Sequence, residues 1–134
     1  MANAPYNKWL EAQVGSAPVN WGSDTIKAAI LSSAYTLSQS HQYYSDLSGV
    51  LGSAALASKT ATNGVLDAAD TTVSGVLASP GHIVVIYKDT GVAGTSQLML
   101  YFDQGIGFDQ TPTGDTTIIW PNTANVKIFP LGLP

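Results

Sequence analysis

Apolar and polar residues alternate along much of the chain in short runs with the two-residue period of β-strands. The run at 24–31 places three apolar side chains on one face (Ile26, Ala28, Ile30) and three others on the opposite face (Thr25, Lys27, Ala29). This alternation predicts a half-buried strand.

The strongest hairpin pattern lies further along the chain. Residues 82–88 and 97–103 are two runs rich in β-branched, aliphatic and aromatic residues, and 89–96 between them is rich in turn formers. A second, weaker hairpin is predicted within 53–73, where two modest strands flank Asn63-Gly64, a pair favoured in two-residue turns. Further strands are expected at 116–120 and 125–129, with turn signals at 105–107 and 111–114.

The N-terminal residues have a different period. Tyr6, Trp9, Leu10 and Val14 recur at helical spacing between a capping Asn3 and a terminating Gly15, so a helix is predicted over 5–14. The polar series at 38–47 reads as a loop or a short helix. The pattern predicts one all-β domain over 1–134, mainly an antiparallel sandwich or barrel, with a short N-terminal helix and with 1–20 as an N-terminal arm.

Composition narrows the classes of function. Charged residues make up 10% of the chain, the net charge is −4, and all five basic residues are single, scattered lysines. Nucleic-acid binding needs a basic patch, so it is not expected. Without Cys, thiolate metal sites and disulfides are excluded. No apolar run approaches a membrane span, and no signal peptide is recognised, so we expect a chain made in the cytoplasm.

Few motifs suggest catalysis. Serine-nucleophile, P-loop and complete dinucleotide motifs are absent from the sequence. Asp89-Thr90-Gly91 matches the tripeptide of aspartic proteases, in which two carboxyls share a proton, and a homodimer would supply the second copy. A hairpin turn is the favoured interpretation, because Lys88 precedes the Asp where an apolar residue is expected. We therefore expect a protein that is not an enzyme and has no cofactor.

Metal ligands are sparse as well. His41 and His82 are the two imidazoles. His41 is expected to be solvent-exposed in a polar loop, and His82 is expected at the surface or in a hydrogen bond, rather than in a metal site. The acidic residues that come close together in the sequence follow no calcium-loop spacing and are expected in turns; they are Asp67, Asp70, Asp103, Asp109 and Asp115.

Three segments resemble a known family. They are Trp21 to Thr36 (WGSDTIKAAILSSAYT), His41 to Leu47 (HQYYSDL) and Val85 to Gly91 (VIYKDTG). In these segments the chain resembles small structural proteins of tailed bacteriophages, often described as head decoration or cement proteins. The resemblance runs from Trp21 to about Asp103, and Leu37 stands where the family tends to have Pro.

The resemblance implies a virion component that binds the major capsid protein on the outside of an assembled capsid, as a homo-oligomer, dimer or trimer. From the residues, we expect partner contacts at Tyr6, Trp9 and Leu10 on the N-terminal helix, because exposed they would form an apolar patch. The adjacent Tyr43 and Tyr44 are further partner-binding candidates. Core packing is the competing interpretation of Trp9.

A second hypothesis is a receptor- or glycan-binding module of a phage tail fibre or tail tip. It would place Tyr43 and Tyr44 over sugar rings, with Asp and Asn side chains bonded to the hydroxyls.

Overall fold

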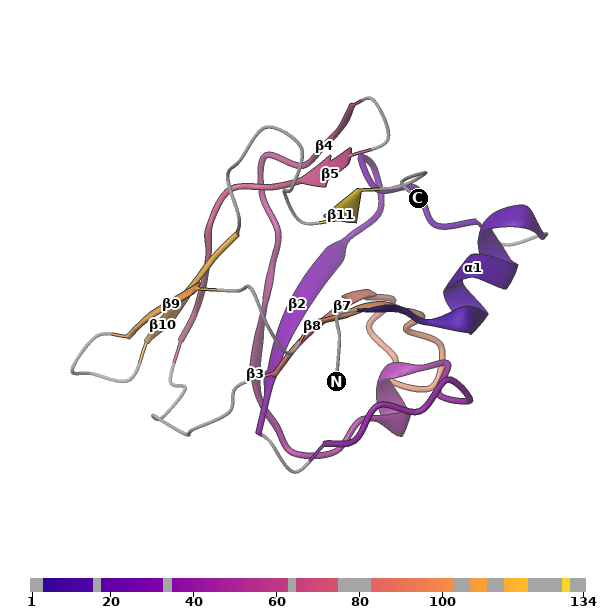
Figure 1. Cartoon of the computed structure of the whole chain (residues 1–134), viewed down its shortest axis with the longest axis horizontal. Coiled ribbons are helices and arrows are strands. Elements are labelled where there is room, and N and C mark those ends of the chain that lie inside the picture. Colours follow the sequence, from indigo (N-terminus) through magenta and orange to yellow (C-terminus); the bar gives the residue numbers. More distant parts are fainter. Residues whose placement is uncertain are drawn as a thin grey trace.

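The computed structural model in Figure 1 describes residues 4–15, 18–32, 35–62, 65–74, 83–102, 107–110, 115–120 and 129–130. These residues form mostly β-strands in antiparallel sheets with one short α-helix, as the sequence predicts. Within this part of the chain no helix is long and apolar enough to cross a membrane.

The largest sheet has five strands in the order β1-β8-β7-β2-β3, all antiparallel to their neighbours. Its strands are β1 (Ala4–Pro5), β2 (Ile26–Leu31), β3 (Val50–Ala55), β7 (Ile83–Lys88) and β8 (Leu98–Phe102). The predicted hairpin is confirmed as β7 and β8, and the predicted strand at 24–31 as β2.

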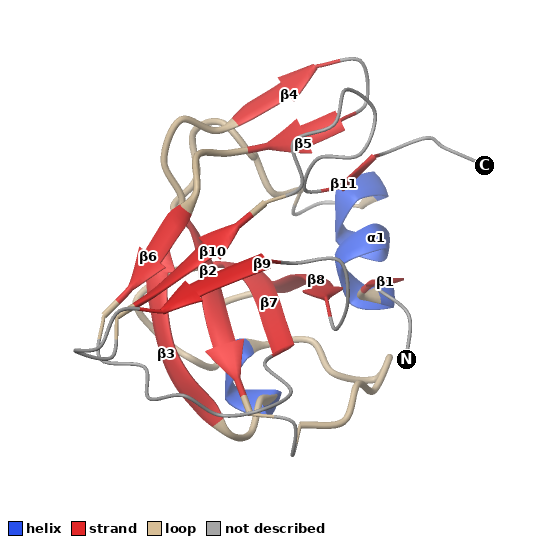
Figure 2. Cartoon of the chain, turned by 60° about the vertical axis from the view of Figure 1, so that its left-hand side comes forward, coloured by secondary structure: helices blue, strands red, loops and turns tan. Residues whose placement is uncertain are grey.

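Two three-stranded sheets complete the β-structure. One has the order β6-β10-β9, from β6 (Thr71–Val73), β10 (Thr116–Ile119) and β9 (Gly107–Gln110). The other has the order β11-β5-β4, from β11 (Phe129–Pro130), β5 (Val65–Asp67) and β4 (Thr60–Thr62). Figure 2 shows β6 running beside β3, so the first small sheet lies against the edge of the large one.

The central strands are buried on both faces. The alternation of β2 predicted one exposed face, but Ala29 and Leu31 are as buried as Ile26, Ala28 and Ile30. The prediction of a half-buried strand is therefore wrong, because cover lies on each side of the sheet.

The register shows what provides that cover. Val85 pairs with Tyr101, so those two side chains share a face with Tyr87, and the rings of Tyr35 and Tyr44 lie on it. On the opposite face, Phe102 contacts the ring of Trp120 from the end of β10, with ring centres 6.1 Å apart. Residues between β2 and β3 thus cover one face of the large sheet. Trp120, which directly follows β10 of a small sheet, covers the other face.

Helix α1 (Asn7–Val14) is the predicted N-terminal helix, and it ends at Gly15 as expected. Its start is later than predicted, because Ala4 and Pro5 pair with Tyr101 and Leu100 as strand β1. The N-cap is Tyr6, without a capping side-chain bond, and the proposed cap Asn3 lies outside the described residues.

The weaker hairpin is confirmed as β4 and β5, whose register ends at Thr62 and Val65 and leaves two residues between them. Strand β10 confirms the prediction at 116–120, whereas most of 125–129 lies outside the described residues and Phe129 belongs to β11. Strands β1, β3, β6 and β9 were not predicted. A one-turn 3-10 helix, η1 (Tyr44–Asp46), lies in the polar series at 38–47.

Candidate functional site

Two segments carry all the partner-binding residues expected from the sequence: the N-terminal segment, residues 4–15, and the loop segment, residues 35–47. They lie on the same side of the molecule, at the right in Figure 1. The side chain of Gln39 joins them, since its Oε1 accepts a hydrogen bond from the Asn7 backbone N–H at 2.7 Å and its Nε2 donates to the Pro5 carbonyl at 3.2 Å. The two groups of candidate residues are therefore parts of one region.

A chain of hydrogen bonds connects the same segments in the interior. The hydroxyls of Tyr6 and Tyr35 are 2.8 Å apart, and the Tyr35 hydroxyl is 2.8 Å from Nδ1 of His41. Burial raises the pKa of both tyrosines, and for Tyr6 the hydrogen bond to Tyr35 raises it further. His41 is half-buried and hydrogen-bonded, so it is only partly exposed, where the sequence predicted a solvent-exposed side chain.

The helix turns its largest residues inward. Tyr6 is 0% exposed and Trp9 is 3% exposed within the single chain, whereas Leu10 is 43% and Val14 is 90% exposed. The expectation that Tyr6 and Trp9 form an exposed patch is wrong, because the segment pairs with β8 and buries them against the body of the chain. The apolar surface of α1 consists of Leu10 and Val14, which are four residues apart and so share a helix face.

Tyr43 and Tyr44 are both half-buried and have different neighbours. The Tyr44 ring packs on Tyr87 with ring centres 4.8 Å apart, while the Tyr43 hydroxyl accepts a hydrogen bond from the Gln42 side chain at 3.0 Å. Asp46 caps this turn. Its carboxylate accepts hydrogen bonds from the backbone N–H groups of Gln42 and Tyr43, which hold the pKa of Asp46 below its usual range.

The loop segment is also tied to the turn between β7 and β8. The backbone N–H groups of Tyr44 and Ser45 donate to the carbonyls of Ser96 and Ala93, at 2.8 and 3.1 Å. The N–H of Leu98 donates to the Gln42 carbonyl at 2.9 Å. Residues 42–45 are therefore fixed by backbone contacts from the neighbouring hairpin.

Asp89 has the geometry of a turn residue. Its carboxylate forms an ion pair with Lys27 at 2.9 Å and accepts the backbone N–H of Gly91, whose φ is 85°. Lys27, followed by the Gly91 N–H, lowers the pKa of Asp89. This environment favours the charged carboxylate, whereas a protease dyad needs a carboxyl that shares a proton.

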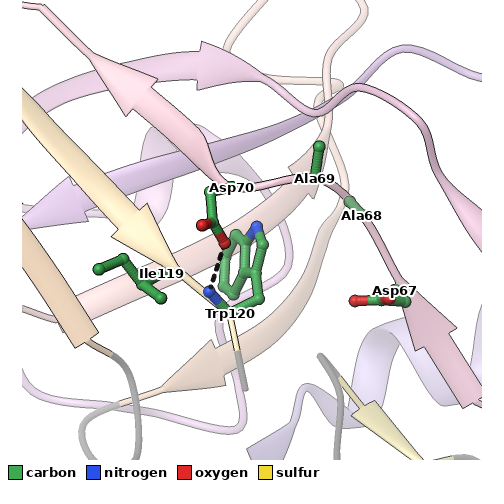
Figure 3. A pocket seen from close by; sticks show the side chains of 6 residues that line it. All are labelled: Asp67, Ala68, Ala69, Asp70, Ile119 and Trp120. Atoms are coloured by element: carbon green, nitrogen blue, oxygen red, sulfur yellow. Dashed lines mark hydrogen bonds between the residues drawn. The ribbon is translucent and has the colours of Figure 1, made fainter. Parts of the chain in front are cut away.

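The acidic residues at 67 and 70 line a hollow of about 310 Å³ with Trp120 and Ile119. Figure 3 shows Asp70 directed at Trp120, whose backbone N–H donates to Asp70 at 3.2 Å, while Asp67 lies on the other side of Ala68 and Ala69. Among the described residues, no three His, Asp or Glu side chains come together as a metal site. His82 and Asp103 lie outside the described residues.

No protein-family model matches the chain, and no curated protein or solved structure matches it either. The candidate site is therefore described from the contacts of this chain alone.

Sequence reasoning missed two parts of this region. Gln39 and His41 lie in a polar series that has no period, so no sequence signal marked their contacts with Asn7, Pro5 and Tyr35. Val14 was recognised as a helix residue, and its exposure follows once Trp9 is known to face inward.

Proposed function

We propose that the chain is a non-enzymatic structural protein of a tailed-phage virion, which binds the outer surface of the capsid and stabilises it. Its partner would be the major capsid protein, and it would act as a homo-oligomer, a dimer or a trimer.

The observation that supports this proposal most is how the three family-like segments sit in the fold. Residues 41–47 bind the hairpin that contains 85–91, and β2 from the first segment pairs with β7 from the third. The segments therefore form one structural unit, in which the shared residues shape strands and turns.

The turn that leads into the first family-like segment also uses its polar side chains to hold the backbone. The Asn20 side chain accepts the N–H groups of Gly22 and Ser23, both at 3.1 Å, and Asp24 accepts the N–H of Asn20 at 2.7 Å. Backbone contacts of Asn20, followed by Lys88, lower the pKa of Asp24. These polar groups are occupied by structural hydrogen bonds, as befits a protein whose role is to bind and not to catalyse.

The test is to locate the protein in the particle. Capsids that lack the chain would be mixed with the purified protein, sedimented, and imaged by electron microscopy. We expect regular density on the outside of the head at the symmetry positions of the lattice. Density at the tail tip, or failure to sediment with heads, would contradict the proposal.

A glycan-binding role at a tail fibre or tail tip is the second candidate. It is favoured by the half-exposed Tyr43, which has the side-chain amides of Gln42 and Gln97 nearby. An aromatic ring flanked by amides suits a sugar, which stacks on one face and hydrogen-bonds at its rim. Titration with host surface polysaccharide, followed by NMR, should shift the signals of Tyr43 and of the Gln42 and Gln97 side-chain amides. Tyr43→Ala should abolish the shifts of the two amides, while Val92→Ala should retain them.

A further inference from the structure

The hydrogen bonds between Tyr6, Tyr35 and His41 form a continuous chain. Whether each hydroxyl proton in this chain has an acceptor depends on how many protons the three side chains carry. Each tyrosine hydroxyl has one proton to donate. With a neutral imidazole whose Nδ1 accepts, Tyr6 donates to Tyr35 and Tyr35 donates to His41. Both hydroxyl protons then have an acceptor.

A proton on His41 upsets this arrangement. Both ring nitrogens of a charged imidazole carry hydrogen, so Nδ1 donates and no longer accepts. Either the Tyr35 proton loses its acceptor, or the chain reverses and the Tyr6 proton loses its acceptor. Tyr6 is fully buried and Tyr35 nearly so, which keeps water from replacing the lost partner.

We propose that this hydrogen-bond chain is a pH-sensitive latch: it holds the N-terminal segment on the body of the protein while His41 is neutral, and it loosens when His41 binds a proton. Histidine is the side chain that ordinarily exchanges its proton between about pH 5 and 8.

The groups around His41 have opposite effects on a charged imidazole ring. Tyr35 contacts the ring directly, with Tyr6 from the N-terminal segment and Tyr101 from β8 behind it. Asp46 from η1 is the nearby acid, and its charge attracts a protonated ring. Asp46 is exposed, so water and salt screen this attraction, whereas the lost acceptor lies in the interior.

Other hydrogen bonds that hold the N-terminal segment on the protein contain no titratable group. The Gln39 bonds to Asn7 and Pro5 remain, and so does the bond from the Tyr6 N–H to the Met99 carbonyl at 2.9 Å. We therefore expect looser local structure in residues 4–15, without dissociation of the segment and without unfolding of the β2–β7 core.

Amide hydrogen exchange of the full chain tests the latch. Exchange would be measured from pH 8 to pH 5 and corrected for the chemical rate at each pH. Peptides covering 4–15 would be compared with reference peptides from β2 and β7. We expect the relative protection of 4–15 to fall roughly tenfold as the pH is lowered, the effect of losing one buried hydrogen bond.

Two histidine variants assign the effect. His41→Asn puts an amide oxygen close to the position of Nδ1, where it accepts from Tyr35 at every pH, so the fall should disappear. His82→Asn removes the other imidazole of the chain and should leave the fall intact. A flat profile in the unmodified protein, or the same fall in His41→Asn, would overturn the proposal.

Tyr35→Phe provides an independent variant that keeps the ring and removes both bonds. It should give low protection of 4–15 at all pH values, with no dependence on pH. Full protection in this variant would show that the hydroxyl does not hold the segment, and would also overturn the proposal. None of these outcomes depends on capsid binding.

Discussion

At the scale of single residues, a substitution of Trp9 tests whether this side chain acts in the core or at the surface. Its side chain is 3% exposed within one chain, so Trp9→Ala should cost about 3–5 kcal/mol of the free energy of unfolding. Leu10→Ala on the exposed side of the same helix should change it by about 0.5 kcal/mol or less. Urea denaturation of the isolated protein would measure both changes. A Trp9→Ala variant as stable as the unmodified protein would show that Trp9 is not a core residue.

Asp89 gives a prediction that depends on pH. Asp89→Asn retains an acceptor for the Gly91 N–H but loses the ion pair with Lys27, and this should cost about 1 kcal/mol at pH 7. Because the folded pKa lies below the ordinary value of 3.8, the charged form is favoured by folding. The stabilisation is complete above that ordinary value and is lost as the pH falls through the lowered pKa.

Denaturant unfolding of both proteins between pH 7 and pH 2 would measure this difference. The two curves of stability against pH should converge at the acidic end. A gap that stays constant would mean that Asp89 acts through the geometry of the turn and not through its charge.

The backbone conformation and the close packing at position 49 require glycine. Its φ is 69°, its carbonyl accepts the Ser32 N–H at 2.9 Å, and an added Cβ would lie 2.5 Å from the Ser32 hydroxyl. Gly49→Ala should cost about 1–3 kcal/mol, whereas Gly94→Ala, where a Cβ meets nothing within 4 Å, should be close to neutral. Thermal unfolding would measure both. A double variant with Ser32→Ala should recover only part of the loss, because the strained φ remains.

At the scale of elements, the sequence predicted the helix and the strands whose residue pattern lies within the element itself and its flanking turns. The β7–β8 hairpin has two apolar runs around a turn, and α1 has its spacing and a terminating glycine, so both were found. Strand β3 was missed because its glycine and small residues, VLGSAA, give little strand signal, and pairing with β2 makes it a strand. The second buried face of β2, which carries Ala29, is covered by Tyr35 and Tyr44, and these residues lie outside the strand in a segment with no regular pattern.

The N-terminal segment shows the same limit for the candidate site. Helical spacing identified Tyr6, Trp9, Leu10 and Val14 as one group, yet which of them face inward is decided by the pairing of Ala4 and Pro5 with β8. A two-residue strand leaves no pattern in the sequence. The exposed and buried members of the group therefore could not be separated before the structure was known.

The placement of the N-terminal segment predicts the effect of deleting residues 2–14. The deletion removes Tyr6 and Trp9 from the core and uncovers the edge of β8, so it should lower the midpoint of thermal unfolding by many degrees. The paired substitution Leu10→Ser with Val14→Ser keeps the segment and should leave the midpoint nearly unchanged. A deletion variant as stable as the full chain would show that the segment is an arm and not part of the domain.

At the scale of the whole molecule, scarcity of charge determines how the protein would hold a partner. Among the described residues the ion pairs are Lys8 with Glu11, Lys27 with Asp89, and Lys88 with Asp24, and all are partly exposed. Exposed pairs contribute about 0–1 kcal/mol each and weaken in salt. Attachment to a capsid should therefore depend on apolar contact and backbone hydrogen bonds.

The exposed apolar side chains of α1 are the matching surface, so Leu10→Asp with Val14→Asp should weaken attachment to capsids by more than about tenfold. Val92→Asp is the matched control, since Val92 is 60% exposed on the turn between β7 and β8. Co-sedimentation in low and high NaCl would measure both effects, and the unmodified protein should remain bound at high salt. Release by moderate salt, together with normal binding of the double variant, would mean that charged groups elsewhere on the surface carry the attachment.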